Sequence, residues 1–134
     1  MTFFEQELKR IVDAGCGINT PTYAARACYG NLGSDLVAKM QFEYPKTVGK
    51  YSTVSVAIMN RKEGVVDKAN FRMRDVWGVK HVVNSNFPKG ISPYIWDTGD
   101  DIDWYVYQPT SDDIIKLAES IRGYIEVFDR KESE

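Results

Sequence analysis

A chain of 134 residues has the size of a single domain, and a chain of this length buries enough surface to fold without a metal ion or a disulfide. With 43% hydrophobic and 27% charged residues, its composition excludes collagen, low-complexity disorder and a disulfide scaffold. No apolar run approaches the ~20 residues of a membrane-spanning helix, and Glu5 and Glu7 stand where a secretion signal is basic and apolar. We therefore expect one soluble, cytoplasmic domain without a membrane partner.

The N-terminal residues predict an amphipathic helix. Thr2 and Glu5 have the spacing of a capping box, in which each residue hydrogen-bonds the backbone of the other. Apolar side chains then recur on one helical face, and Gly15 and Gly17 follow as helix-ending residues. The predicted apolar stripe consists of Phe4, Leu8, Ile11 and Val12.

From Pro21 onward the apolar residues recur with the period of two that is typical of β-strands. We expect a weak strand over 22–32, a strand with one apolar face over 36–44 and a third strand over 51–60. A turn over 61–64 should return the chain into a fourth strand, 65–74. In this last strand we expect Val65, Ala69, Phe71 and Met73 to be buried, and Lys68, Asn70, Arg72 and Arg74 to lie on the other face.

The second half of the chain is less regular until its final helix. Residues 80–83 favour a short strand, and 94–96 and 104–107 favour a hairpin around an acidic turn. Thr110 or Ser111 is the predicted N-cap of a helix whose apolar face ends at Phe128, and 129–134 are expected to form a frayed polar tail. The members of this apolar face are Ile114, Leu117, Ala118, Ile121, Ile125 and Phe128.

These elements predict a single α+β domain over residues 1–134. Consecutive strands joined by short turns favour a mostly antiparallel meander of four to six strands. The N-terminal and C-terminal amphipathic helices should both pack on one face of this sheet.

Motifs of catalysis and of cofactor binding are missing from the sequence. It contains no phosphate-binding glycine loop, no G-x-S-x-G and no H-E-x-x-H, and its single histidine, His81, has no nucleophile or ligand set beside it. Cys16 and Cys28 are expected to be reduced thiols, too few for a structural zinc site. We expect no metal and no cofactor. A small enzyme using the carboxylates between Asp97 and Asp103 is the third-ranked hypothesis.

The most unusual feature is an aromatic segment, residues 77–107, which holds seven of the 17 aromatic residues and all three tryptophans. Trp and Tyr beside charged residues are typical of binding hot spots, although the same residues could instead anchor an irregular segment to a sheet. The leading hypothesis is a non-catalytic binding or adaptor domain with a protein partner. Its candidate contact residues, aromatic with an acidic rim, are Trp77, Tyr94, Trp96, Asp97, Asp101, Trp104 and Tyr105.

Charge is segregated along the chain. Residues 46–89 carry nine Lys and Arg against three acids, whereas residues 90–134 carry four against eleven. Lys68, Arg72 and Arg74 alternate along one predicted strand face, and Lys39 joins them if the two strands lie close in the sheet. The alternative hypothesis is therefore a nucleic-acid-associated accessory protein that uses this basic face. The sequence pI of 5.5 and the absence of RNP and KH motifs favour a merely solvated face instead.

Three stretches, residues 72–80, 91–96 and 104–110, resemble small uncharacterised bacterial proteins that are associated with mobile genetic elements. The resemblance covers most of the chain. It implies a bacterial cytoplasmic setting and favours protein or DNA as the partner, and it brings no known activity, ligand or site.

Overall fold

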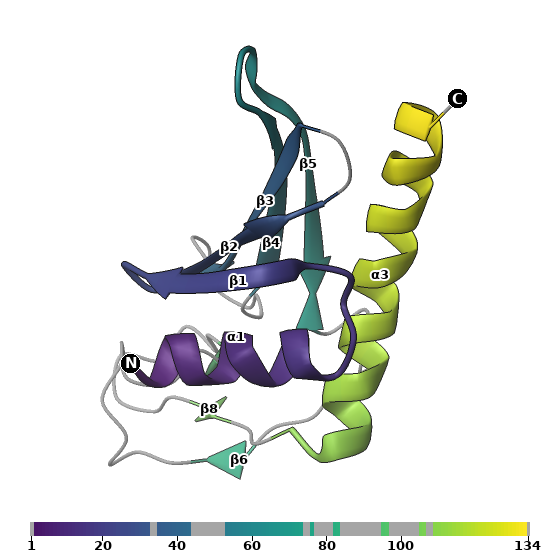
Figure 1. Ribbon diagram of the computed structural model, residues 1–134. Helices are drawn as coiled ribbons and strands as arrows, with labels where there is room; N and C mark the ends of the chain where they lie inside the picture. The colour runs from purple at the N-terminus through teal and green to yellow at the C-terminus, as the bar shows by residue number, and fades with distance from the viewer. Residues whose placement is uncertain are drawn as a thin grey trace.

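The computed structural model describes residues 2–32, 35–43, 53–73, 76, 82–83, 95–96, 105–106 and 109–133. Five strands form an antiparallel meander in which neighbours in sequence are neighbours in the sheet (Figure 1). They are β1 (Asn19–Ala24), β2 (Ala27–Asn31), β3 (Leu36–Glu43), β4 (Thr53–Asn60) and β5 (Gly64–Arg72). A second, three-stranded sheet has the order β6 (Val82–Val83), β8 (Tyr105–Val106), β7 (Ile95–Trp96). With helices α1 (Phe3–Asp13) and α3 (Ser111–Ser133), the fold is α+β, as predicted.

Both helices begin at the residues that the sequence indicates. Thr2 Oγ1 accepts from the backbone N–H of Glu5 at 3.2 Å, and the backbone N–H of Thr2 donates to Glu5 Oε2 at 2.7 Å. Thr110 and Asp113 make the same reciprocal pair at the start of α3, at 3.2 and 3.0 Å. These side chains satisfy backbone N–H groups that the first turn of a helix leaves without partners.

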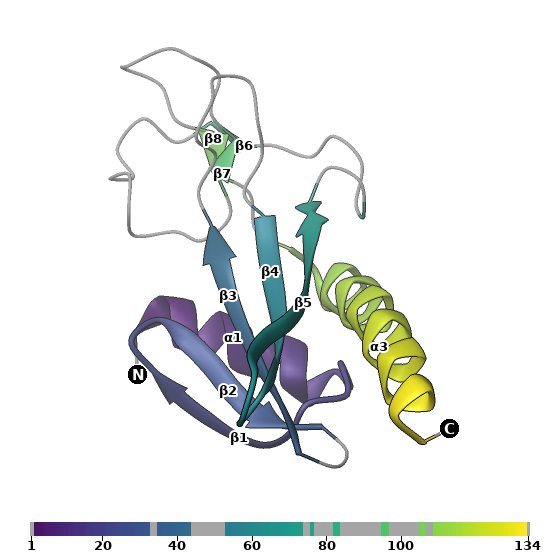
Figure 2. The ribbon, with the colours of Figure 1, turned by 90° about the horizontal axis from the view of Figure 1, so that it is seen from above.

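The two helices pack on the same face of the five-stranded sheet, as the apolar stripes predict. Helix α1 contacts β1, β2 and β3, α3 contacts β5, and the two helices contact each other. In Figure 2, which looks down on the sheet, α1 lies behind the strands and α3 lies beside β5. The core between them contains Leu8, Ile11, Ala38, Met40, Val54, Val56, Ile58, Leu117, Ala118, Ile121 and Ile125.

The prediction of one weak strand over residues 22–32 is wrong, because this region forms the β1–β2 hairpin. Its two-residue turn consists of Ala25 (φ 51°) and Arg26 (φ 60°), and Ala24 pairs with Ala27 across it. Positive φ at both central positions is the geometry of a type I′ turn, which Asn and Gly favour and Ala and Arg do not. The sequence therefore gives no turn signal at this position.

The prediction that Val65 is buried is also wrong, since its exposed fraction is 62%. The β4–β5 register shifts between Ile58 and Met59, and such a bulge inserts one extra residue and reverses the alternation beyond it. After the bulge, Met73 is buried as predicted, whereas Ala69 and Phe71, opposite Val56 and Val54, are half-buried.

Three further expectations concern short strands and the final helix in the second half of the chain. The strand expected within 80–83 is present as β6, and the expected hairpin pairing is present as the antiparallel pair β7 and β8. The backbone of residues 129–133 continues α3, so the helix runs to Ser133 instead of giving way to a polar tail at residue 129.

Candidate binding face on the sheet

The face of the five-stranded sheet opposite the helices carries a row of aligned side chains from four strands. Register places Tyr29 of β2 opposite Lys39 of β3, Lys39 opposite Ala57 of β4, and Ala57 opposite Lys68 of β5. One row toward the end of β5, Gln41, Ser55 and Asn70 align, and the next row contains Glu43, Thr53 and Arg72. We call these ten residues the helix-free face, because neither of the described helices α1 and α3 packs on this side of the sheet.

Lys39 and Lys68 thus lie on the same face with β4 between them. Ala57, Ser55 and Thr53, the residues that β4 contributes, are small, while those of β3 and β5 are long and polar. Adjacent strands are ~4.8 Å apart, so the two ammonium-bearing stems start about two strand spacings from each other. On this face, therefore, the short side chains of β4 lie between the longer polar side chains of β3 and β5.

Glu43 is the centre of a polar network on this face. Its Oε1 accepts from Lys68 Nζ at 3.3 Å and from Gln41 Nε2 at 3.4 Å, and the hydroxyl of Ser55, which is 2% exposed, also donates to the carboxylate. Burial raises the pKa of Glu43, but the hydrogen bonds and the charge of Lys68, helped by Gln41 and Ser55, outweigh it and lower the pKa below its usual range. Glu43 is therefore ionised at neutral pH.

Lys39 is held by an aromatic ring instead of a carboxylate. Its Nζ lies 5.7 Å from the centroid of the Tyr29 ring, within cation–π range. Both side chains are half-buried, whereas Arg72 is exposed. The outward-facing residues of β1–β5 include three cations and one anion, Glu43, so this part of the described chain carries local positive charge.

Most of the predicted aromatic surface lies outside the described residues. This applies to Trp77, Tyr94, Asp97, Asp101 and Trp104, and also to Arg74 of the basic set. Trp96 and Tyr105 are paired residues of β7 and β8, of which the backbone alone is described. Of the predicted basic set, the structure brings Lys39, Lys68 and Arg72 to one face.

Tyr29, Gln41, Glu43 and Ser55 are site residues that sequence reasoning missed. Tyr29 could not be assigned to a face of the sheet from the sequence, because the β1–β2 hairpin was not predicted. Gln41 and Glu43 have the same strand parity as Lys39, and this signal was present in the sequence. The contact between Glu43 and Lys68, however, joins two strands across a third, and no spacing in the sequence reports it.

The two cysteines lie in the core with Tyr23 beside them. Cys16 and Cys28 are free thiols with no exposed surface, and Tyr23 pairs with Cys28 across β1 and β2. Burial raises the pKa of both thiols, that of Cys28 to about 12, and burial raises the pKa of Tyr23 to about 12. A thiol that is neutral and buried is a poor nucleophile, so we assign these residues to packing.

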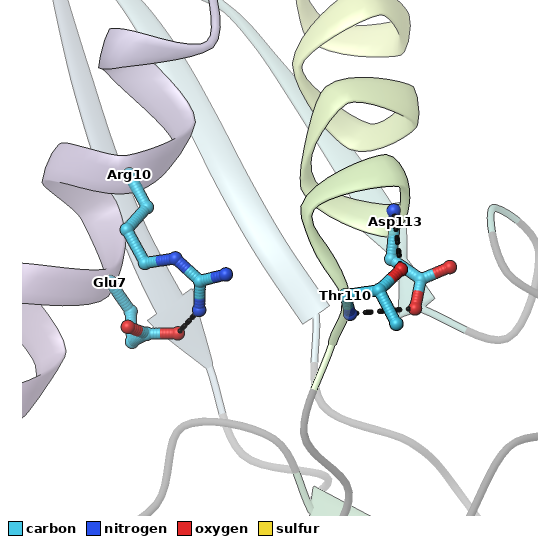
Figure 3. A network of polar contacts seen from close by, with 4 residues as sticks. All are labelled: Glu7, Arg10, Thr110 and Asp113. Carbon is cyan, nitrogen blue, oxygen red and sulfur yellow. Dashed lines mark hydrogen bonds and ion pairs between the residues drawn. The ribbon is translucent and has the colours of Figure 1, made fainter.

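A shallow cleft of about 270 Å³ separates the last turn of α1 from the first turn of α3, and its walls include Arg10, Asp13, Ser111 and Ile114. Its charged groups are already paired: Arg10 with Glu7 at 2.8 Å and Asp13 with Lys9 at 2.8 Å. Figure 3 shows the Arg10–Glu7 pair on α1 facing the Thr110–Asp113 cap of α3. The cleft is smaller than ordinary ligand pockets, which start near ~300 Å³.

No protein-family model, curated protein or solved structure matches this chain. Within the described ranges, neither helix combines the length and the apolar composition that crossing a bilayer requires. The described residues also contain no group of three or more His, Cys, Asp and Glu side chains placed to hold a metal ion.

Proposed function

We propose that the protein is a non-catalytic binding domain whose helix-free face binds single-stranded nucleic acid. The observation that carries this proposal is the aligned row of Tyr29, Lys39, Ala57 and Lys68, with Arg72 on the same face. Proteins that bind single strands combine cations that contact phosphates with aromatic rings on which bases stack. A sheet face offers both groups at fixed spacing, because its side chains alternate strictly.

The acidic pI of the chain does not oppose this proposal, because the relevant charge is local. The described acids of α3, such as Glu119 and Glu126, belong to a helix on the opposite side of the sheet. Packed layers are ~10 Å apart, and the Debye length is about 8 Å at physiological salt, so these acids are largely screened from the helix-free face.

A salt titration tests the proposal, with oligothymidine DNA and oligouridine RNA as probes. We expect the affinity of the wild-type protein to fall steeply between about 50 and 200 mM salt, because each phosphate contact releases counterions. The triple variant Lys39→Ala, Lys68→Ala, Arg72→Ala should flatten the slope of log affinity against log salt by about two, at about 0.7 per contact. Fluorescence anisotropy measures both quantities.

The matched control is the triple variant Arg61→Ala, Lys62→Ala, Lys116→Ala, which removes three exposed cations elsewhere and the same net charge. It should keep the wild-type slope. A second variant, Tyr29→Leu, should weaken binding without changing the slope, since stacking is worth ~1–3 kcal/mol per base and involves no phosphate. Equal effects of the two triple variants would contradict the proposal. A wild-type protein that binds neither probe at low salt would refute it and leave the aromatic segment as the remaining candidate surface.

A further inference from the structure

Two of the three cations on the helix-free face lack a carboxylate partner among the described residues, and the third has one. Lys68 Nζ contacts Glu43 Oε1 at 3.3 Å, whereas Lys39 contacts the Tyr29 ring and Arg72 makes no described ion pair. A phosphate that reaches this face would therefore find one cation already occupied by an anion of the protein.

We infer that Glu43 competes with phosphate for Lys68 and so sets how tightly the helix-free face holds a polyanion. The inference rests on the proposed function. It adds an acidic residue, which lowers the affinity for phosphate, to a surface that is otherwise described by its cations. Lys39 and Arg72 then make the first phosphate contacts, and Lys68 adds its own contact after it leaves Glu43.

The contacts of Glu43 explain why the carboxylate stays in place while Lys68 moves. Gln41 and Ser55, its neighbours on β3 and β4, donate hydrogen bonds to it, and one third of its side chain is exposed (33%). Lys68 projects from β5, has a 47% exposed side chain and has no other described partner. A lysine stem has several rotatable bonds, so its ammonium group can reach a ligand without a change in the backbone.

The expected effect is modest. Exposed ion pairs contribute ~0.2–1 kcal/mol, which corresponds to a competition of up to about fivefold in affinity. Replacing the carboxylate with an isosteric amide keeps an oxygen that can accept from Gln41 Nε2 and removes the charge that holds Lys68. Glu43→Gln should therefore release Lys68 for phosphate with little change in the sheet.

The experiment compares wild type, Glu43→Gln and Glu63→Gln, an equal change of charge in the exposed β4–β5 turn, in salt titrations with oligothymidine. Glu43→Gln should bind about two- to fivefold more tightly, because Lys68 no longer has to leave a carboxylate before it contacts a phosphate, while the salt slope stays close to that of wild type. The addition of Lys68→Ala to Glu43→Gln should abolish this gain, as a double-mutant cycle requires. Glu43→Thr, which also removes the charge and suits a strand, repeats the test if the amide variant folds poorly.

The outcomes separate this inference from the proposed function. If wild type binds and Glu43→Gln matches either wild type or Glu63→Gln, the competition is refuted while the binding function stands. A gain that persists after Lys68→Ala also refutes it, because the gain would then arise without Lys68. If neither wild type nor any variant binds the strand, both are refuted.

Discussion

The two faces of the five-stranded sheet are built from alternating residues of the same strands, and they differ in almost every property. On β3 and β4, Met40, Val56 and Ile58 have no exposed surface and pack under the helices. Their immediate neighbours Lys39, Gln41 and Ala57 face the other way and are half-buried. A shift of one residue in register would exchange the two sets. The register that buries the apolar residues under the helices therefore also determines which residues lie on the helix-free face.

The difference in energy between the faces is large. Full burial of a Val, Ile or Met side chain stabilises the fold by roughly 1.5–3 kcal/mol, whereas an exposed ion pair such as Lys68 and Glu43 contributes ~0–1 kcal/mol. The covered face therefore determines whether the chain folds. The helix-free face can change its charge pattern at little risk to the fold, which suits a surface that binds a ligand.

The largest expected effect tests this division by truncating two consecutive residues of β4. Ile58→Ala should lower the free energy of unfolding by about 2–5 kcal/mol, because it removes buried apolar atoms and leaves a cavity among packed side chains. Met59→Ala, on the opposite face, should lower it by about 1 kcal/mol or less. Denaturant unfolding measures both, and the slope with denaturant should stay constant. Equal losses would mean that the helix-free face is packed as firmly as the core.

Local patterns predicted most of this architecture, because they depend on neighbours in sequence. The Thr2–Glu5 cap, the two apolar stripes and the alternation over residues 36–44 are of this kind, and the structure confirms them as far as its described residues reach, which leaves out Tyr44 and the side chain of Phe128. The β1–β2 turn was not predicted, because Ala25 and Arg26 adopt a conformation that their residue types disfavour.

The helix-free face was only partly predictable. The alternation of Lys68 and Arg72 indicated a basic strand face, and the structure adds Lys39 to it through β4. The Glu43–Lys68 contact joins residues 25 apart in sequence, and the bulge that exposes Val65 is set by the pairing of β4 with β5. Both follow from strand register, which the spacing of residues within a strand does not specify.

A second, smaller expected effect concerns the contact between α3 and β5, the edge strand of the sheet. Tyr124 donates a hydrogen bond to Asp67 Oδ2 at 2.5 Å and packs edge-on against Phe71, with ring centroids 6.1 Å apart. Burial, then the hydrogen bond and charge of Asp67, raise the pKa of Tyr124 above its usual value of 10. The native state thus holds this proton more tightly than the unfolded state does. The resulting stability is complete below about pH 10 and is lost as the pH rises through the native pKa.

Tyr124→Phe should therefore lower the free energy of unfolding by roughly 1 kcal/mol at neutral pH, the net value of one hydrogen bond. The difference from wild type should shrink as the pH rises above 10, because wild type then loses the same interaction. Urea unfolding over a series of alkaline pH values measures this. Tyr29→Phe, which removes a hydroxyl from the helix-free face, is the control. A Tyr124→Phe deficit that stays constant with pH would assign the loss to packing.

The smallest expected effect tests whether backbone strain in the β1–β2 turn contributes to the difference in stability between the two faces. The β1–β2 turn has φ of 51° at Ala25 and 60° at Arg26, and the Arg26 guanidinium lies 4.9 Å from the centroid of the Phe4 ring on α1. This cation–π contact joins the turn to the covered side of the sheet, so the test changes Ala25 and keeps Arg26.

Ala25→Asn should raise the free energy of unfolding by up to about 1 kcal/mol, because Asn tolerates positive φ and Ala does not. Ala24→Asn, the same change in an exposed strand residue one position earlier, should give a slight loss, since strands disfavour Asn. A thermal shift of the same sign and size in both variants would show that the turn stores no strain. A gain confined to Ala25 would show that the hairpin supplying Tyr29 to the helix-free face adopts a disfavoured backbone conformation at Ala25.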